Sequence, residues 1–134
     1  MSEPKWLQRR WVDAIHYQQL QRFGGLFGVR DAGAIDAALA RPRNRWEYND
    51  DVDLPGLAAA YGFALTRTHG YVDGNKRIGF MAMAIFLDLN DWRLSAPEPE
   101  VVQVMVAVAA GEMTEAELAE WVRRYSEPGP ASAS

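Results

Sequence analysis

The stretch HGYVDGNKRIGF, from His69 to Phe80, decides how the chain is organised. Its first nine residues are rich in glycine and charge and include an asparagine, and glycine and asparagine are poor choices for a helix interior. From Ile78 onward, apolar residues recur every three or four positions as far as Leu89, which is the helical pattern. The stretch therefore predicts a polar turn that leads directly into a helix.

The same period continues on both sides of the turn and predicts an all-α domain of about six helices. Asp31 and Thr114 are expected N-caps, and Thr114 with Glu117 forms a capping-box pattern. The expected helices run from about Leu7 to Gly24, from Asp31 to just before Pro42, from Pro55 to His69, from within the opening stretch to Asn90, from Pro97 to Ala110, and from Thr114 onward. The polar, aromatic segment 43–53, RNRWEYNDDVD, fits none of them and is expected to be a flap, either a loop or a weak hairpin.

Length and composition limit the kinds of protein to consider. The 134 residues fit one domain, residues 1–126, followed by a disordered tail at 127–134, EPGPASAS. The sequence contains no run of about 18 apolar residues, so no membrane-spanning helix is expected. The N-terminus lacks the apolar region of a signal peptide. The absence of cysteine fits a cytoplasmic protein, and a net charge of −4 argues against direct binding of nucleic acid.

The second half of the turn has the composition of an anion site. The amides near Gly74 and Asn75 would lie at a helix N-terminus, where unpaired N–H groups and the helix dipole favour a phosphate. Glycine allows a ligand to approach the backbone closely. Lys76 and Arg77 add two cations, and arginine binds phosphate oxygens through paired hydrogen bonds.

The first half of the turn supplies two further chemical groups. Asp73 offers a hard oxygen ligand, and Mg²⁺ is commonly held by one or two carboxylates together with substrate phosphates and water. His69 is suited to accept a proton from an attacking hydroxyl, because an unperturbed histidine titrates near neutral pH. Together the nine residues predict nucleotide-dependent transfer of a group to a hydroxyl.

Each of these residues also has an ordinary structural explanation. His69 fits a helix C-cap, Asp73 with Gly74 fits a common turn, Asn75 fits an N-cap, and Lys76 and Arg77 fit solvated surface charges. Four such explanations would have to coincide beside one helix start. Composition and spacing alone leave both interpretations open.

The turn also resembles the signature of the Fic/Doc (Fido) superfamily. The matching positions are His69, Tyr71, Asp73, Gly74, Asn75 and Arg77. Segments upstream (RFGGLFGVRDAGAIDAALARP) and downstream (FLDLNDWRLSAP and AAGEMTEAELAEWV) are similar to death-on-curing, or Doc-type, toxins. The likeness covers roughly Arg9 to Val122, nearly the whole expected domain.

Two departures indicate the branch of the superfamily. AMP-transferring members carry a second glycine and a final arginine where this chain has Lys76 and Phe80, whereas Asn-Lys-Arg is the Doc-type pattern. The resemblance therefore implies a toxin of a toxin–antitoxin system that uses ATP and Mg²⁺ to phosphorylate a hydroxyl of elongation factor Tu and so arrests translation. Gly74 is the AMP-transferase choice, so AMP transfer remains an alternative, and a catalytically idle binding module is another.

The resemblance also implies a role for each residue of the motif. His69 would be the general base, Asp73 would hold Mg²⁺, and Gly74 with Asn75 would form the anion-binding turn. Lys76 and Arg77 would grip the phosphates, which makes His69, Asp73 and Arg77 the expected catalytic set. In the flap, Arg45, Trp46 and Tyr48 would dock the target by strand addition. The alternative for Trp46 and Tyr48 is that they pack the flap onto the core.

Regulation is expected to come from a separate partner. The chain contains no Ser/Thr-x-x-x-Glu-Gly/Asn inhibitory string of the kind by which many Fic proteins restrain themselves. A small antitoxin folding onto the toxin would then block the site. Its expected seat is a groove beside the first helix, with Trp6 and Trp11 as candidate contacts, although packing in the core is the alternative for Trp11.

Overall fold

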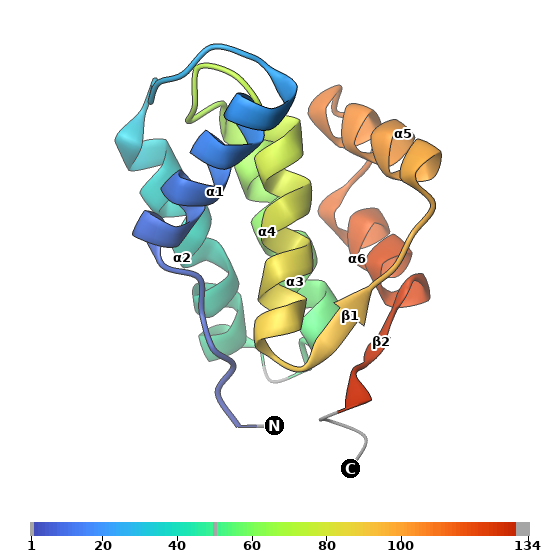
Figure 1. Cartoon of the computed structure of the whole chain (residues 1–134). Helices are drawn as coiled ribbons and strands as arrows, with labels where there is room; N and C mark the ends of the chain where they lie inside the picture. The colour runs from blue at the N-terminus through green and yellow to red at the C-terminus, as the bar shows by residue number, and fades with distance from the viewer. Residues whose placement is uncertain (1, 50, 131–134) are drawn as a thin grey trace.

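The computed structural model describes residues 2–49 and 51–130, which fold into six helices and two short strands (Figure 1). In chain order the elements are α1 (Arg9–Phe23), α2 (Ala32–Tyr48), α3 (Leu54–Thr68), α4 (Asn75–Leu89), β1 (Trp92–Leu94), α5 (Glu98–Ala109), α6 (Glu115–Arg124) and β2 (Ser126–Pro128). Helices α1 and α2 lie on one side of the α3–α4 pair, and α5 and α6 lie on the other. The all-α prediction is confirmed.

Helix α3 is the centre of the domain. Its sequence, LPGLAAAYGFALTRT, is apolar or small around most of its circumference, as expected of a helix buried on all sides. It packs on α4, α6 and α2, and Leu57, Ala60 and Tyr61 are fully buried. The Tyr61 hydroxyl accepts a hydrogen bond from the backbone N–H of Leu7 at 3.0 Å, which ties the N-terminal segment to the core.

The contact between α3 and α4 depends on glycine. A Cβ atom at Gly79 would lie 2.1 Å from Oγ1 of Thr66 and 3.0 Å from the carbonyl oxygen of Gly62. Gly62 lies on the facing helix, where a Cβ atom would meet the side chain of Met83. The two glycines therefore let the backbones of α3 and α4 approach closely.

The predicted N-caps are present, whereas the predicted end of the second helix is wrong. Asp31 and Thr114 cap α2 and α6, and Thr114 forms the full capping box with Glu117. Helix α2, however, continues through Pro42 to Tyr48. A proline removes one backbone hydrogen bond but does not end a helix whose later turns are anchored.

Two contacts anchor the end of α2. Glu115 of α6 accepts hydrogen bonds from both Arg41 and Arg45, and Trp46 packs edge-on against Trp6 with ring centroids 6.2 Å apart. The expected flap at 43–53 is therefore helical as far as Tyr48. The connection to α3 is reduced to residues 49–53, of which residue 50 lies outside the described residues.

The two strands form a small antiparallel ribbon that the sequence does not predict. Trp92 pairs with Pro128, and Leu94 pairs with Ser126. Three residues are too few to show the alternation by which a strand is identified. Glu127 and Pro128, the first residues of the expected tail, are thus part of this ribbon, while residues 131–134 of that tail lie outside the described residues.

The side chain of Asp53 joins α3 to α6 and gives a first test of the fold. It accepts from the backbone N–H of Gly56 as the α3 N-cap and pairs with Arg123. We expect Asp53→Ala to lower the free energy of unfolding by about 1–2 kcal/mol in urea denaturation. Glu120→Ala, which removes the other, more exposed partner of Arg123, is the control and should change stability by no more than about 0.5 kcal/mol.

The contribution of Asp53 should also depend on pH in a known direction. Arg123 first, and the Gly56 amide after it, hold the pKa of the Asp53 carboxyl below its usual range. The stabilisation is therefore complete above the carboxyl's ordinary pKa and is lost as the pH falls through its lower folded pKa. The difference between the wild type and Asp53→Ala should shrink in acid; an unchanged difference would contradict this account.

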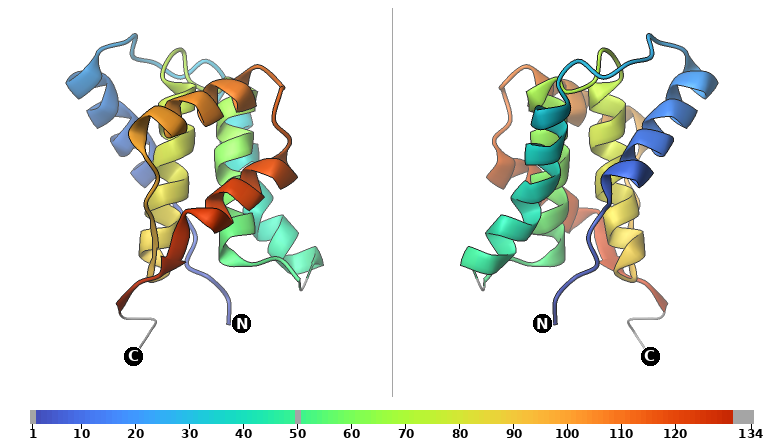
Figure 2. Two further views of the ribbon diagram at one scale, coloured as in Figure 1. Left: turned by 90° about the vertical axis from the view of Figure 1, so that its right-hand side faces the viewer. Right: turned by 90° about the vertical axis from the view of Figure 1, so that its left-hand side faces the viewer.

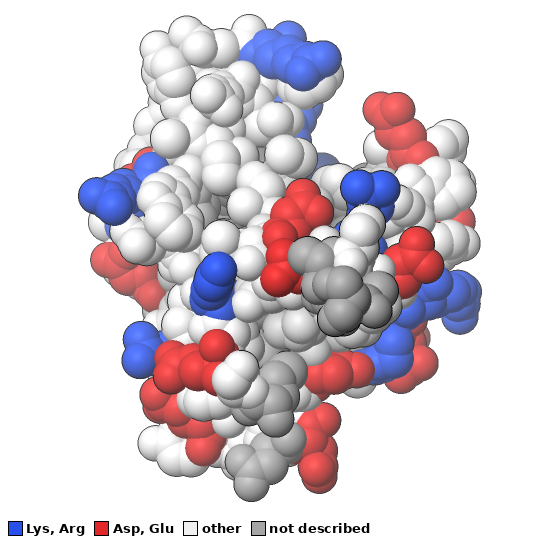
Figure 3. Space-filling view, turned by 60° about the horizontal axis from the view of Figure 1, so that its bottom comes forward, with Lys and Arg blue, Asp and Glu red and all other residues white. Residues whose placement is uncertain are grey.

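Two loops meet at one end of the molecule. Figures 1 and 2 show that the loop between α1 and α2 lies beside the loop between α3 and α4, while β2 and the segment before α1 lie at the other end. On the face drawn in Figure 3, acidic and basic side chains are interspersed. Within the described ranges, no helix combines the length and apolar character needed to cross a bilayer.

Candidate active site

The polar turn predicted from the sequence is the loop 69–74 between α3 and α4. The loop 24–31 is bound to it by backbone hydrogen bonds. The backbone N–H groups of Arg30 and Asp31 both donate to the carbonyl of Gly70, at 2.8 and 2.9 Å. Val72 donates to the carbonyl of Gly28 at 3.0 Å, and Val29 forms a β-bridge with Tyr71. The two loops therefore behave as one backbone unit.

His69 ends α3 in an unusual conformation. It is the C-cap of the helix, with φ 51° and ψ 43°, in the left-handed region that glycine normally occupies at this position. Its side chain is exposed. The capping explanation thus describes its backbone correctly, but a histidine there is a costly choice for capping alone.

Asp73 is exposed and held by two backbone amides. Its Oδ2 accepts from the N–H of Leu26 at 3.0 Å and its Oδ1 from the N–H of Gly74 at 2.8 Å. These bonds, with the Leu26 bond the largest cause, hold the pKa of the Asp73 carboxyl below its usual range. The carboxylate is therefore ionised at neutral pH, and each oxygen keeps a lone pair for a cation.

Asn75, the first residue of α4, fixes the shape of the turn. Its side-chain amide donates to the carbonyl of Tyr71 at 2.9 Å, and its Oδ1 accepts from the Tyr71 N–H at 3.1 Å. Gly74 precedes it with φ 77° and ψ 19°, a left-handed conformation that glycine adopts without strain. The side chain of Asn75 is thus a brace for the loop, and only its backbone remains for an anion.

The two cations occupy different environments. Lys76 is exposed, whereas Arg77 is half-buried and its guanidinium lies 4.9 Å from the centre of the Phe23 ring. Such stacking leaves the edge of a guanidinium able to donate hydrogen bonds. Phe23, on the last turn of α1, thereby places the arginine at the start of α4.

These residues border one cavity of about 660 Å³. At its polar end lie Asp73, Gly74, Asn75, Lys76 and Arg77, beside the N-terminus of α4. Its remaining walls are mostly apolar and come from α1, α4 and α5, namely Phe23, Phe80, Met81, Val101, Val102, Met105 and Val106, with Glu98 at α5's first turn. A cavity of this size with an anion-binding end and apolar walls fits a ligand with both characters.

His69 is not among the residues that line this cavity. It is the first residue of the same loop, five positions from Gly74, so the loop brings the candidate base and the anion-binding turn together on one short segment.

Two polar residues of α1 that the sequence analysis did not single out, His16 and Asp13, support the loop. His16 of α1 is buried, and its Nε2 lies 2.7 Å from the carbonyl oxygen of Asp73. Its ring stacks on Tyr71, and the Tyr71 hydroxyl donates to Asp13 at 2.5 Å. Burial and this hydrogen bond raise the pKa of the Tyr71 phenol, so it retains its proton. The spacing of Asp13 and His16, three residues apart on one helix face, was the available signal.

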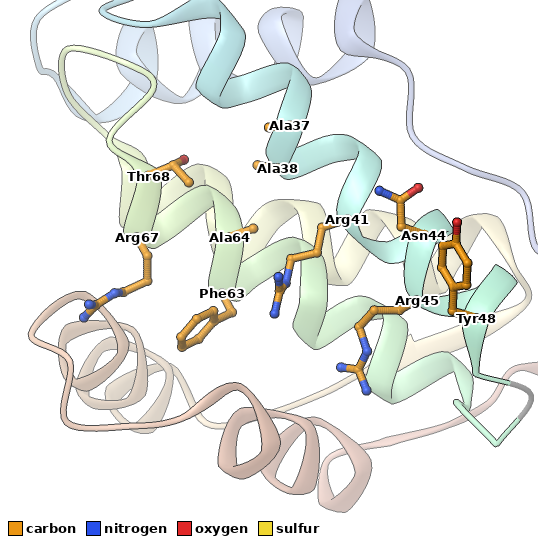
Figure 4. Close-up of a pocket in the computed structure, with 10 residues that line it drawn as sticks. All are labelled: Ala37, Ala38, Arg41, Asn44, Arg45, Tyr48, Phe63, Ala64, Arg67 and Thr68. Atoms are coloured by element: carbon orange, nitrogen blue, oxygen red, sulfur yellow. The ribbon is translucent and has the colours of Figure 1, made fainter.

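The three residues expected to dock the target do not act as one group. Figure 4 shows Arg45 and Tyr48 in a second cavity, of about 570 Å³, between α2 and α3, together with Arg41 and Arg67. Trp46 instead packs against the core beside Trp6. Strand addition needs an extended segment with free backbone N–H groups, and Arg45 to Tyr48 are helical, with their N–H groups inside α2. That docking mode is therefore corrected for these residues.

The brace formed by Asn75 gives a second test. We expect Asn75→Ala to lower the free energy of unfolding by about 1–3 kcal/mol, because it removes two partly buried hydrogen bonds to Tyr71. Urea denaturation measures the change. The matched control is Asn44→Ala at an exposed position of α2, where little change is expected. Equal effects in the two variants would show that the brace contributes nothing.

With this geometry established, comparison with known proteins identifies the family. Residues 6–87 match the model of the Fic/DOC family, and the chain belongs to that family. It is 32% identical over 111 residues to the protein kinase doc of Escherichia phage P1, which covers 83% of this chain and 87% of that protein. It is 46% identical over 77 residues to the toxin Doc of Mycolicibacterium smegmatis, covering 55% and 58% of the two chains. These relatives confirm the Doc-type toxin expected from the motif.

Proposed function

We propose that this protein is a kinase toxin that transfers the terminal phosphate of ATP to a hydroxyl of a target protein. The observation that carries the proposal is the position of an ionised, exposed Asp73 beside the N-terminus of α4, at the polar end of a cavity with apolar walls. The name of the phage relative, protein kinase doc, supports phosphate as the transferred group.

The residues at the cavity fit a magnesium nucleotide. Among the described residues no cluster of three His, Asp or Glu side chains forms a dedicated metal cage, and Mg²⁺ commonly takes one carboxylate plus phosphate oxygens and water. Asp73 would hold the metal, while the first amides of α4, Lys76 and Arg77 would bind the phosphates. The apolar side chains of α5 would cover the adenine ring of the nucleotide. The bound metal would neutralise charge on the phosphates during transfer.

The proposed reaction needs one proton acceptor at the loop. The target hydroxyl gives its proton to His69 as its oxygen bonds to the terminal phosphorus of ATP. The bond from that phosphorus to the bridging oxygen breaks, and ADP leaves with the electron pair. His69 is exposed, which suits a residue that must reach a hydroxyl on another protein.

Two partners belong to this proposal. The target is elongation factor Tu, as the resemblance to Doc-type toxins implies. The toxin relatives also imply an antitoxin that acts in trans. Trp6 and Trp11, its expected contacts, are partly buried against the core, so we place its seat on the exposed apolar side chains near the cavity: Phe23, Leu26, Phe27, Val72, Val102 and Val106.

Mass spectrometry of the intact target tests the function. Purified elongation factor Tu is incubated with the protein, ATP and Mg²⁺, and the expected result is a mass gain of one phosphate. A gain of one AMP would assign the protein to the AMP-transferring branch and overturn the kinase proposal. Absence of any gain, repeated with a whole lysate as the source of acceptors, would overturn both activities.

A further inference from the structure

Helix α1 carries a row of polar side chains that faces the catalytic loop. Arg9, Asp13 and His16 are spaced by four and three residues and therefore share one face of the helix. Arg9 donates to Asp13 and also pairs with Asp36 of α2. Asp13 in turn accepts from the Tyr71 hydroxyl. The row connects the body of the domain to the loop that carries Asp73.

The last member of the row, His16, makes the contact of most consequence. Its side chain is 5% exposed, its ring lies flat on Tyr71 with centroids 3.7 Å apart, and its Nε2 lies 2.7 Å from the Asp73 carbonyl oxygen. A carbonyl oxygen only accepts hydrogen bonds, so Nε2 must carry the hydrogen. The imidazole is thus a hydrogen-bond donor held in a fixed orientation by stacking.

This contact determines how the Asp73–Gly74 peptide faces. In a trans peptide the C=O and N–H point in opposite directions, so a carbonyl held towards α1 turns the Gly74 N–H away from it. That N–H is the donor to Oδ1 of Asp73. Rotation of this peptide would turn the Gly74 N–H away from that carboxylate. The carboxylate would then lose one of its two amide bonds.

We propose that His16 is a positioning residue of the active site: its Nε2–H fixes the Asp73–Gly74 peptide and thereby directs the Asp73 carboxylate into the nucleotide cavity. The kinetic consequence rests on the proposed phosphate transfer. The contact of His16 with the loop does not depend on that proposal.

Two matched variants separate the hydrogen bond from the packing. His16→Gln and His16→Met have side chains of similar length and shape, and both lose the ring that stacks on Tyr71, but only glutamine keeps an N–H donor at the end. With elongation factor Tu, ATP and Mg²⁺, we expect His16→Gln to keep kcat within a few-fold of the wild type. His16→Met should lose about tenfold to a hundredfold, because small misplacements of a catalytic group have effects of that size.

A residue with only a packing role would not produce this split. Thermal unfolding of both variants, followed by circular dichroism, provides the control for stability. Equal kcat values in the two variants, whether retained or lost, would overturn the proposal.

A second measurement needs neither activity nor a variant that folds. In ¹⁵N-labelled wild-type protein, the ring nitrogens of His16 report which of them carries hydrogen. We expect Nε2 to be protonated and its hydrogen protected from exchange with solvent. A bare Nε2 would overturn the proposal even if transfer were observed. If the wild type transfers nothing, the proposed function fails, while this measurement still decides the role of His16.

Discussion

Replacement of His69 by glycine is expected to remove phosphate transfer almost completely while making the fold more stable. Loss of a general base typically lowers kcat by about 10²–10⁴-fold. The same change removes the strain of a non-glycine residue in the left-handed region, which glycine adopts freely. The free energy of unfolding should therefore rise by as much as about 1 kcal/mol. Transfer assays and urea denaturation on one preparation measure both effects.

Two further variants of His69 distinguish its proposed role as general base from its role as the C-cap of α3. His69→Ala removes the base but keeps a Cβ atom in the left-handed region, so it should be inactive without the gain in stability. His69→Asn tolerates the conformation better and should also be inactive. Retained activity in all three variants would exclude His69 as the base and leave capping as its role.

The largest loss of stability is expected from Gly79→Ala. The new methyl group would meet Thr66 Oγ1 and the carbonyl of Gly62, and neither helix backbone can withdraw without opening the α3–α4 contact. A contact as close as 2.1 Å lies at the upper end of the cost of crowding a core, about 3 kcal/mol or more, so after the gain of about 1 kcal/mol in helix propensity the net cost should be about 2 kcal/mol or more. Urea denaturation gives this value.

A double variant shows whether the clash is the cause. Among the described residues, the Thr66 hydroxyl is buried without a hydrogen-bond partner, so Thr66→Ala removes the nearest obstacle and no bond. Thr66→Ala/Gly79→Ala should recover part of the stability, and the remaining loss reports the contact with the Gly62 carbonyl. Gly33→Ala, at an exposed position in the first turn of α2, is the control and should be neutral or slightly stabilising. Strict additivity of Thr66→Ala and Gly79→Ala would contradict the clash.

The sequence predicted those features that depend on local patterns. The end of α3 at His69, the start of α4 within the motif and the capping box at Thr114 all follow from residue types at fixed spacings, and the structure has them where expected. The turn at Gly74 and Asn75 belongs to the same class, because the two residues lie next to each other in the chain.

Features that depend on distant contacts were missed. Helix α2 continues past Pro42 because Glu115, about 70 residues later, holds Arg41 and Arg45, and no local rule contains that interaction. The Leu26 amide that holds Asp73, and the His16 side chain beneath it, likewise come from segments about 50 residues earlier. The place of the loop between two helices was thus predictable, whereas the distant contacts that hold it in place were not.

The two halves of the site rest on elements of unequal stability. His69 extends from α3, which is buried along nearly its whole length, whereas Asp73 depends on α1 and the loop 24–31, and α1 packs on α4 but only slightly on α2. Proteins open in cooperative units of different free energy, and peripheral helices open before central ones. Local unfolding of α1 would remove the contacts that position Asp73, while His69 would keep its place at the end of α3. Inactivation is therefore expected to precede global unfolding, and a ligand that holds α1 on the core without covering the cavity would delay it.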